Sequence, residues 1–492
     1  MYIDNILLLL GLPTLLGYAL LLLVFRGYQL PLLLTLSASY GVGMAVIAFW
    51  MFFLGVCQMP FELGTIALPL AGFLLVIGMI LFWQRSKNER RTLMPSADAP
   101  MKEAKRDKLS HFIVITFYVL ILSYLALNTC HIFWRALNMP VYTWDAISTS
   151  ALRAKVFFYD RSMKELSNLP HASYPLLVPF IKTWAALCLG EWHERLVKIL
   201  FPFGYISFLG ITFAFLKIMT NRAWAALGIA ILITSNMFLI HATISYQDFF
   251  MMYYTCSAIM FLLLWLKSGC RGFLLTASFF TGAGSFVKLE GSAYVLIIFV
   301  LFLVLDLTLK GATRREKWLN AVFFTLPSFA LMLSYHAYKF FILALDLEGT
   351  ETAKTAVTFE LSHLERVPKI IYAFLENMFL LGSWGVAYML LALSLVIYAF
   401  KKKSTEQNLL LLALGLFFTL YFFVALCTAS YEWLAGKVRM AGLARILLHF
   451  YPLVPLFVIL TSYDPFLIPL SKKKPVSFTP VDKKPNKKKH RR

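Results

Sequence analysis

QRSKNERRTLMPSADAPMKEAKRDKLS, residues 84–110, separates two long apolar runs and concentrates Lys and Arg between them. Short loops rich in these residues stay on the cytoplasmic side of a membrane. The loop therefore predicts a chain that crosses a membrane before and after it, with the loop itself in the cytoplasm. Its basic residues are Arg85, Lys87, Arg90, Arg91, Lys102, Lys105, Arg106 and Lys108.

The composition also indicates a membrane protein. Of the 492 residues, 60% are hydrophobic and 14% are charged, whereas soluble domains are roughly 45–50% apolar and about 25% charged. A soluble core could not hide this much apolar surface, but a bilayer solvates it. The composition therefore excludes an ordinary soluble domain.

The apolar runs predict the membrane spans. A helix needs about 20 apolar residues to cross a hydrocarbon core of roughly 30 Å, and it satisfies its own backbone hydrogen bonds in lipid. We therefore expect an all-α integral membrane protein with about thirteen transmembrane helices and a large outer-face loop. The predicted spans are 5–25, 31–56, 64–83, 111–133, 197–217, 222–243, 249–266, 272–287, 291–309, 318–341, 381–400, 408–428 and 448–466.

Alternation along the chain predicts the orientation. Counting spans from the 84–110 loop places the other basic clusters on the cytoplasmic side, with the N-terminus outside and the C-terminus inside. The net charge of +21 is thereby explained by basic residues that set the topology or contact membrane lipid. Nucleic acid is therefore not a predicted partner. The clusters are Lys217/Arg222, Lys267/Arg271, Arg314/Arg315/Lys317, Lys401/Lys402/Lys403 and the tail 472–492.

The same count divides the chain into three parts. Residues 1–109 are expected to form N-terminal transmembrane helices and the basic cytoplasmic loop, and 467–492 a basic cytoplasmic tail. Residues 110–466 are expected to form a second transmembrane domain with outer loops 134–196 and 342–380. In the second outer loop, apolar residues at helical spacing favour a helix at the membrane interface, with an ordinary connecting loop as the alternative.

The first outer loop is basic although it is expected to lie outside. Two interpretations are open. Long loops are translocated whatever their charge, or these cations meet an anion at the outer membrane face. They are Arg135, Arg153, Lys155, Arg161, Lys164, Lys182, Arg195 and Lys198.

Five motifs lie in an order that is typical of one group of enzymes. They are TWDAISTSALRAKVFFYDR (143–161), HASYPLLVPFIKTWAALCLGEWHERL (171–196), SYQDFFMMYY (245–254), FVKLEGSAY (286–294) and ARILLHFYPLVPL (444–456). In this order the motifs resemble the polyprenol-phosphate-sugar-dependent glycosyltransferases of the GT-C superfamily. That group includes the protein O-mannosyltransferases and the aminoarabinose transferases of lipid A. The first three predicted spans take no part in the resemblance.

The resemblance implies a GT-C fold with surface helices in the outer loop, in a bacterial cytoplasmic (inner) membrane. It implies transfer of a sugar from a polyprenyl-phosphate-linked donor to a glycan, lipid or protein acceptor, by general-base catalysis with inversion. Outside the cell there is no nucleotide-sugar pool, so such a transfer needs a lipid-linked donor. It also needs an acid to take the acceptor's proton and cations to stabilise the leaving phosphate.

The motifs name the candidate site residues. The resemblance makes Asp145 the catalytic base and Asp248 a second catalytic acid that helps to bind acceptor or metal. For both aspartates the alternative role is a helix cap, because Asp favours helix starts. For the cations the alternatives are anchoring at the membrane interface, snorkelling of the side chain to that interface, or ion pairing. The donor-phosphate candidates are Arg153, Lys155, His171, Lys288, Arg445 and His449, and the substrate-binding candidates are Trp144, Tyr174 and Glu290.

The chain departs from the family pattern at two places. It has Tyr174 where several relatives carry a cation beside the proline, so Arg153, His171 or Lys182 would have to supply that charge. No second acid stands beside Asp248 to chelate a divalent ion, so metal dependence is not predicted, and a divalent metal stays open as a cofactor. The six cysteines are scattered and offer neither a zinc site nor a disulfide framework.

Other functions stay open as alternatives. A lipid-linked glycan ligase or polymerase also uses lipid-linked sugar, but its large catalytic loop is expected late in the chain. A polysaccharide flippase or other transporter is expected to show internal repeats or paired broken helices at mid-membrane, and the sequence shows no convincing repeat. A scaffold role explains none of the motif order.

Overall fold

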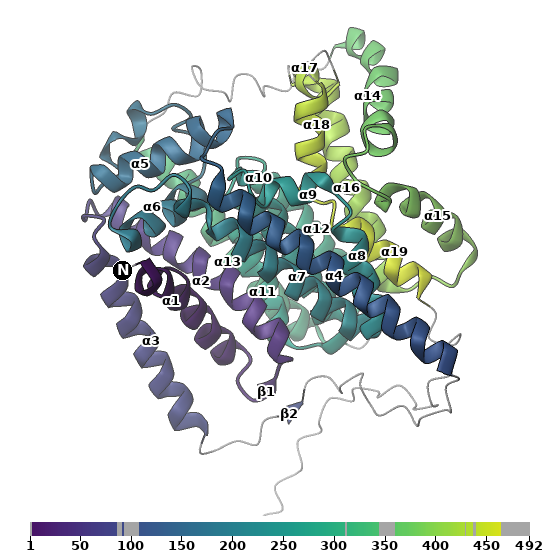
Figure 1. The fold of residues 1–492 in the computed structure, drawn as a ribbon, viewed down its shortest axis with the longest axis horizontal. Helices are drawn as coiled ribbons and strands as arrows, with labels where there is room; N and C mark the ends of the chain where they lie inside the picture. Colours follow the sequence, from purple (N-terminus) through teal and green to yellow (C-terminus); the bar gives the residue numbers. More distant parts are fainter. Residues whose placement is uncertain are drawn as a thin grey trace, which may run out of the picture.

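The computed structural model describes residues 2–85, 91–92, 108–309, 312–343, 360–428, 430–435 and 439–463. Most of the predicted basic loop, residues 344–359 of the second outer loop and the whole tail 467–492 lie outside the described residues. Within the described part the protein is a packed body of helices (Figure 1). Strand is limited there to one short parallel pairing, β1 (Tyr28–Gln29) with β2 (Arg91–Thr92).

The helices follow one another through mostly short connections. Their bounds are α1 Tyr2–Val24, α2 Leu32–Val56, α3 Leu63–Arg85, α4 Lys108–Asn138, α5 Leu152–Tyr159, α6 Leu177–Leu189, α7 Leu200–Met219, α8 Arg222–Leu232, α9 Asn236–His241, α10 Gln247–Ser268, α11 Arg271–Ser285, α12 Gly291–Thr308, α13 Arg314–Phe341, α14 Arg366–Leu375, α15 Ala387–Phe400, α16 Thr405–Cys427, α17 Tyr431–Leu434, α18 Arg439–Leu448 and α19 Leu453–Ser462. Single turns of π-helix (η1 Ala146–Ala151, η6 Glu376–Leu380) and of 3₁₀-helix (η2 Lys164–Asn168, η3 Leu196–Lys198, η5 Leu361–Glu365) join them.

Nine helices within the described residues are long and apolar enough to cross a membrane. A tenth is counted if Gly442–Leu448 and Leu453–Ser462, which are bent by 52°, form one span. The prediction of an all-α, multi-pass membrane protein is confirmed at this level. The nine are Asn5–Val24, Leu32–Val56, Leu63–Trp83, Phe112–Asn138, Leu196–Met219, Gln247–Ser268, Gly291–Thr308, Arg314–Phe341 and Thr405–Cys427.

Four of the thirteen predicted spans are shorter or bent in the structure. Predicted span 222–243 is two helices, α8 and α9, because the Ser235 hydroxyl accepts from the N–H of Phe238 at 3.2 Å and starts a new helix. A hydropathy pattern does not reveal such a cap. The other three are 272–287, which is the 15-residue α11, 381–400, which is the 14-residue α15, and 448–466, which begins inside the bend between α18 and α19.

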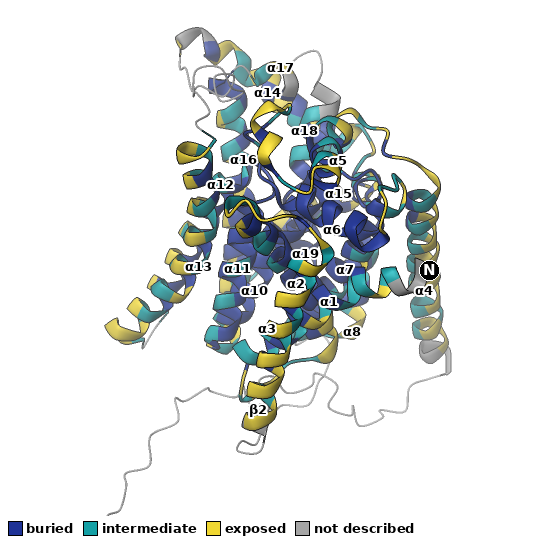
Figure 2. Ribbon diagram, turned by 90° about the vertical axis from the view of Figure 1, so that its left-hand side faces the viewer, coloured by how far each residue is buried: buried dark blue, intermediate teal, exposed yellow. Residues whose placement is uncertain are grey.

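Helix α10 is the centre of the bundle. Its residues from Gln247 to Trp265 are all buried, and it contacts α7, α11, α12 and α18. Helices α3 and α4 lie outside with apolar side chains exposed (Figure 2); Phe82 of α3 is 80% exposed and Leu127 of α4 is 70% exposed. Exposed apolar helices of this length are stable in lipid, which solvates them, and not in water.

The first two helices belong to the same packed body as the rest. Helices α1 and α2 contact each other and α6, and α2 also contacts α7. Gly43 allows the close approach, because a Cβ there would collide with the carbonyl group of Pro13, and small residues have this role between membrane helices. Trp184 of α6 donates from Nε1 to the carbonyl of Leu9 at 3.1 Å. The later chain is thus packed on the first spans.

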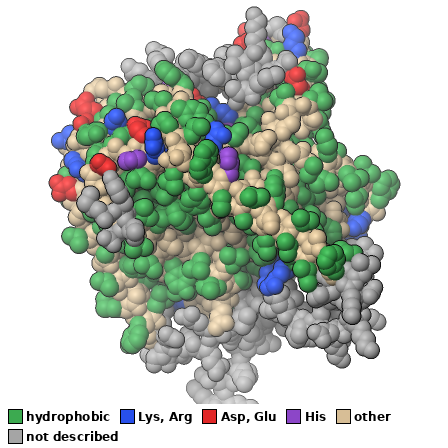
Figure 3. Space-filling view, in the orientation of Figure 1, with side chains coloured by type: hydrophobic (Ala, Val, Ile, Leu, Met, Phe, Trp, Pro, Cys, Tyr) green, Lys and Arg blue, Asp and Glu red, His purple; other side chains and the backbone are tan. Residues whose placement is uncertain are grey.

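Two segments mark opposite ends of the molecule. The α5–α6 segment lies at one end and the β1–β2 pairing at the other, with α4 running between them (Figure 1). Charged side chains gather around the α5–α6 end and near α14, and a broad, mostly hydrophobic band lies below them (Figure 3). Residues 91–92, a described part of the predicted basic loop, thus lie at the opposite end of the protein from the α5–α6 segment of the first outer loop.

Candidate active site

Asp145 stands between the end of α4 and the start of η1. Its backbone is already helical, and its side chain makes no capping hydrogen bond. Instead, its Oδ2 accepts a hydrogen bond from Nη1 of Arg445 at 2.5 Å. The side chain is 39% exposed, so the carboxylate is held in place and still faces solvent. The capping interpretation of this side chain is therefore wrong.

Asp248 is the second residue of α10, and its side chain is 1% exposed. Three side chains donate to it: Arg445 Nη2 to Oδ2 at 3.0 Å, Lys288 Nζ to Oδ1 at 3.1 Å, and His449 Nε2 to Oδ1 at 3.0 Å. A carboxylate in the first turn of a helix also gains from the helix dipole. A buried charge is tolerated only with partners of this kind, so Asp248 is a fixed hub of the cluster.

Arg445 of α18 links the two acids. Its two Nη atoms reach the carboxylates of Asp145 and Asp248 at the same time. Its guanidinium lies over the ring of Tyr246, 4.4 Å from the ring centroid, which is cation–π distance. The planar fork of arginine suits this arrangement because its donors point in fixed directions. The two acids are thereby locked in position relative to each other.

Lys288 and Glu290 lie in the turn between α11 and α12. The Nζ of Lys288 lies 3.4 Å from Oε1 of Glu290, in addition to its contact with Asp248. Burial alone would lower the pKa of Lys288, but the attraction of the two carboxylates is stronger, and the pKa is raised. Burial likewise pushes the pKa of Glu290 up, and Lys288 brings it below its usual value. Both side chains are therefore charged at neutral pH.

Two tyrosines that the sequence did not single out continue the network into the bundle. The Tyr294 hydroxyl lies 2.9 Å from Nδ1 of His449 and also hydrogen-bonds the hydroxyl of Tyr421. Because an ionised carboxylate only accepts, Nε2 of His449 donates to Asp248, and in a neutral ring Nδ1 then accepts from Tyr294. The sequence signal that could have found these residues is a tyrosine inside an apolar span, because its hydroxyl needs a partner there.

Six of the predicted site residues therefore come together through side-chain contacts. We refer to them as the acid cluster, and its members are Asp145, Asp248, Lys288, Glu290, Arg445 and His449.

Arg153 lies outside the acid cluster and is fully buried. Its Nε donates to the carbonyl of Thr149, and its Nη1 donates to the carbonyl of Tyr174 at 2.8 Å. Its Nη2 is buried and has no hydrogen-bond partner among the described residues. Arg153 therefore has donor capacity that the protein itself does not use.

The remaining predicted residues border Arg153 or lie at the surface. Tyr174 is partly buried, and the ring of His171 packs edge-on against its ring, with centroids 5.5 Å apart. His171 has a left-handed backbone, φ 57°. Lys155 is exposed, and Trp144, next to Asp145, is 76% exposed. Lys155 and Trp144 thus lie at the surface, and Tyr174, with His171 packed on it, lies beside Arg153.

Lys182 is a second fully buried cation near Arg153. It lies in the middle of α6, and its Nζ donates to the hydroxyl of Ser150 at 2.6 Å and to the carbonyl of Ser245 at 3.3 Å. Neither partner is charged. A lysine inside the apolar run LVPFIKTWAALCL is a signal that sequence reading can find, because charges in apolar helices are functional suspects. We refer to Arg153 and Lys182 as the buried-cation pair.

The acid cluster and the buried-cation pair are neighbours. Ser245, which accepts from Lys182, lies three residues before Asp248. The N–H of Leu177, the first residue of α6, donates to the carbonyl of Phe286 at 2.9 Å, in the turn that also carries Lys288. Helix α6 thus packs directly on the segments that present the acid cluster.

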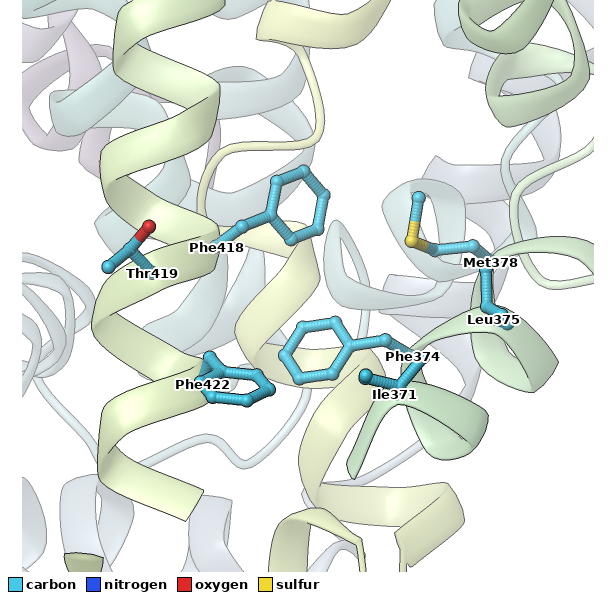
Figure 4. A pocket seen from close by; sticks show the side chains of 7 residues that line it. All are labelled: Ile371, Phe374, Leu375, Met378, Phe418, Thr419 and Phe422. Atoms are coloured by element: carbon cyan, nitrogen blue, oxygen red, sulfur yellow. The ribbon is translucent and has the colours of Figure 1, made fainter. Parts of the chain in front are cut away.

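The second outer loop contributes a helix, α14, where its spacing predicts one. Helix α14 with η6 and helix α16 enclose an apolar groove of about 380 Å³ (Figure 4). Phe374 and Met378 face Phe418 and Phe422 across it. The lining carries no charged side chain, so the groove suits apolar chains and offers no acid–base chemistry.

Among the described residues, no group of three or more His, Cys, Asp or Glu side chains is placed to hold a metal ion. Comparisons of the chain with protein-family models, with curated proteins and with solved structures give no match. A functional assignment therefore has to be argued from the motif order and from the contacts of the site.

Proposed function

We propose that this chain is a membrane glycosyltransferase that moves a sugar from a polyprenyl-phosphate donor to a glycan, lipid or protein acceptor. It acts at the outer face of a bacterial cytoplasmic (inner) membrane, with its N-terminus outside and its C-terminus in the cytoplasm. The observation that carries the proposal is the Asp145–Arg445–Asp248 bridge: one partly exposed carboxylate is locked to a buried one by a single guanidinium. The order of the motifs supports the same reaction.

Asp145 acts as the general base. Its carboxylate takes the proton of the acceptor hydroxyl or amine while the acceptor atom bonds to the anomeric carbon. The bond from that carbon to the phosphate oxygen breaks, and its electron pair leaves with polyprenyl phosphate. A single displacement inverts the anomeric carbon. Asp145 then returns its proton to water through its exposed side, and a base of this kind contributes typically about 10²–10⁴-fold in rate.

Arg445, Lys288 and His449 position this base rather than bind the phosphate. Their donors already face carboxylates, so a phosphate at Arg445 would compete with Asp145 for Nη1. Asp248 acts through Arg445, because it fixes the guanidinium that orients Asp145. Glu290 balances Lys288. In this arrangement Arg445 and Lys288 have carboxylate partners without a ligand.

The leaving phosphate lies beside Arg153 in this proposal. The Nη2 of Arg153 has no partner among the described residues, and a charged donor stabilises the negative charge that grows as the glycosidic bond breaks. Lys155 adds positive charge on the same loop, the ring of His171 packs on Tyr174, and the carbonyl of Tyr174 accepts from the guanidinium. Exposed Trp144 offers an aromatic face to the sugar ring beside the base.

The proposal is tested by donor cleavage with the purified chain in lipid nanodiscs. Labelled polyprenyl-phosphate sugars are supplied one sugar at a time, with an envelope extract as the source of acceptors. We expect one donor to release polyprenyl phosphate and to transfer its label to the extract, and Asp145→Asn to do neither. Cleavage of diphosphate-linked glycans alone would instead indicate a ligase or polymerase. Movement of intact donor across a vesicle, without cleavage, would indicate a flippase.

A further inference from the structure

The acid cluster and the buried-cation pair differ in the charge of the groups that contact their cations. Lys288 and Arg445 of the acid cluster face carboxylates. Arg153 and Lys182 are each 0% exposed, and their hydrogen bonds go to backbone carbonyls and one hydroxyl. A buried charge without a counter-charge is unfavourable. The buried-cation pair is therefore a place where an anion would be stabilised.

A count of donors points the same way. The buried Nη2 of Arg153 has two hydrogens without an acceptor among the described residues. A charged Lys182 has three hydrogens for two acceptors, the Ser150 hydroxyl and the Ser245 carbonyl. A neutral Lys182 has two hydrogens and is satisfied by these two groups. In its charged form the pair thus has more hydrogens than oxygen acceptors among the described residues, with the ring of Phe201 5.9 Å from Nζ of Lys182 as a further, weaker partner.

The two cations sit on packed neighbouring segments. Ser150, the partner of Lys182, lies three residues before Arg153 on the continuous η1–α5 stretch. Thr183, the residue after Lys182, donates to the carbonyl of Ala154, the residue after Arg153, at 3.2 Å. The positive charge of Arg153 therefore acts on Lys182, although less than Glu194 and Lys198 do.

The charge of Lys182 changes near neutral pH. The pKa of Lys182 is lowered to about 7, chiefly by burial; the negative charge of Glu194 raises this pKa, and the positive charges of Lys198 and Arg153 lower it. These are the charged groups that face Lys182 from the loop after α6, from η3 and from α5. A negative charge beside Arg153 would act in the same sense as Glu194, and would favour the ammonium form.

We infer that an anion bound beside Arg153 is taken up together with one proton, and that Lys182 is the group that receives the proton. The inference uses the proposed function only to name the anion, which is the phosphodiester of a polyprenyl-phosphate sugar. Because proton and anion binding are linked, each strengthens the other by the same factor. Affinity for the anion therefore falls as pH rises through neutrality.

The probe that tests this is farnesyl methyl phosphate. It is a prenyl phosphodiester without a sugar, and it keeps a single negative charge across the range tested, so any pH dependence belongs to the protein. The dissociation constant is measured with the full chain in nanodiscs from about pH 6 to about pH 9. We expect it to be level at low pH and to increase above about pH 7, with a slope approaching tenfold per pH unit.

Two variants assign the proton to Lys182. Lys182→Met keeps the length of the side chain and removes its charge, so the slope should disappear while Arg153 still holds the anion. Glu194→Gln is a mild change at a partly exposed position, and it should move the onset of the pH dependence to lower pH. Melting temperatures recorded beside the titrations show that each variant is folded; if Lys182→Met does not fold, the Glu194→Gln shift decides.

Three outcomes would overturn the inference: no binding of the probe at any pH, a flat titration in the wild type, or an unchanged slope in folded Lys182→Met. These outcomes are separable from the fate of the enzyme proposal. Proton-linked binding without sugar transfer would keep the inference and remove the proposed reaction. Sugar transfer with pH-independent binding would keep the reaction and remove the inference.

Discussion

The acid cluster and the buried-cation pair are neighbours, but their charges are organised in opposite ways. The acid cluster has three carboxylates, and its cations Arg445 and Lys288 both contact carboxylates. The buried-cation pair has two cations whose described hydrogen bonds all go to neutral groups. In the acid cluster each of these two cations has a carboxylate partner as the protein folds, and in the proposed function a ligand supplies the anion for the other region.

This difference assigns different roles to residues that look alike in the sequence. An arginine whose fork is occupied by two acids is suited to hold a base in position. An arginine with a buried, unused Nη2 is suited to receive an anion. We therefore expect replacement of Arg445 and replacement of Arg153 to have different effects on the stability of the protein and on donor binding.

The largest effect on folding is expected for Arg445→Met. This change leaves buried Asp248 with Lys288 and His449 as its remaining partners and releases Asp145. Removing one partner of a buried ion pair typically costs about 3–5 kcal/mol, so the free energy of unfolding should fall by that order. Denaturant unfolding of the purified variants gives the value. An unchanged stability would mean that the bridge is not formed in the folded protein.

The matched change, Arg153→Met, should show the reverse pattern. It removes a buried charge that no carboxylate balances, so stability should stay close to wild type. Donor affinity should fall, because a hydrogen bond to a charged group is worth about 1.5–3 kcal/mol, which is roughly a tenfold to hundredfold change in the dissociation constant. Titration with farnesyl methyl phosphate measures it. Equal affinities in Arg153→Met and the wild type would move the phosphate to another cation.

A smaller effect is expected for Tyr294→Phe. The change removes the hydroxyl that hydrogen-bonds Nδ1 of His449 and keeps the ring packing. A net loss of about 0.5–1.5 kcal/mol in unfolding free energy is typical for one hydrogen bond. Transfer should slow only modestly, because Asp248 keeps its contacts with Arg445 and Lys288. A loss of activity as large as that of Asp145→Asn would make Tyr294 a direct participant in the reaction.

Much of the fold follows from the sequence, because apolar length is a local property. Residues 84–110 and the long apolar runs predict a multi-pass helical protein, and nine helices of spanning length are present in the described part. The prediction of a span from its apolar length fails where a polar contact interrupts the helix. Ser235 caps α9 in the middle of the predicted span 222–243, and the chain bends between α18 and α19 inside the last one.

The members of the candidate site could be named from the sequence, but their contacts could not. Motif order named Asp145, Asp248 and Arg445, but only the fold shows that one guanidinium reaches both acids. The distinction between a capping aspartate and a bridging one depends on a residue 300 positions away. The same limit applies to Lys182, whose partner Ser245 lies 63 positions further along.

Asp145→Asn tests the central claim most directly. Asparagine keeps the shape of the side chain and an oxygen that can accept from Arg445, but at neutral pH it cannot take a proton. Because the side chain is 39% exposed, loss of the ion pair should cost at most about 1 kcal/mol in stability. The measurement is the single-turnover rate of polyprenyl phosphate release, taken beside the melting temperature. We expect a rate lower by about 10²–10⁴-fold with melting close to wild type. A normal rate in a less stable protein would contradict it and make Asp145 an anchor for Arg445.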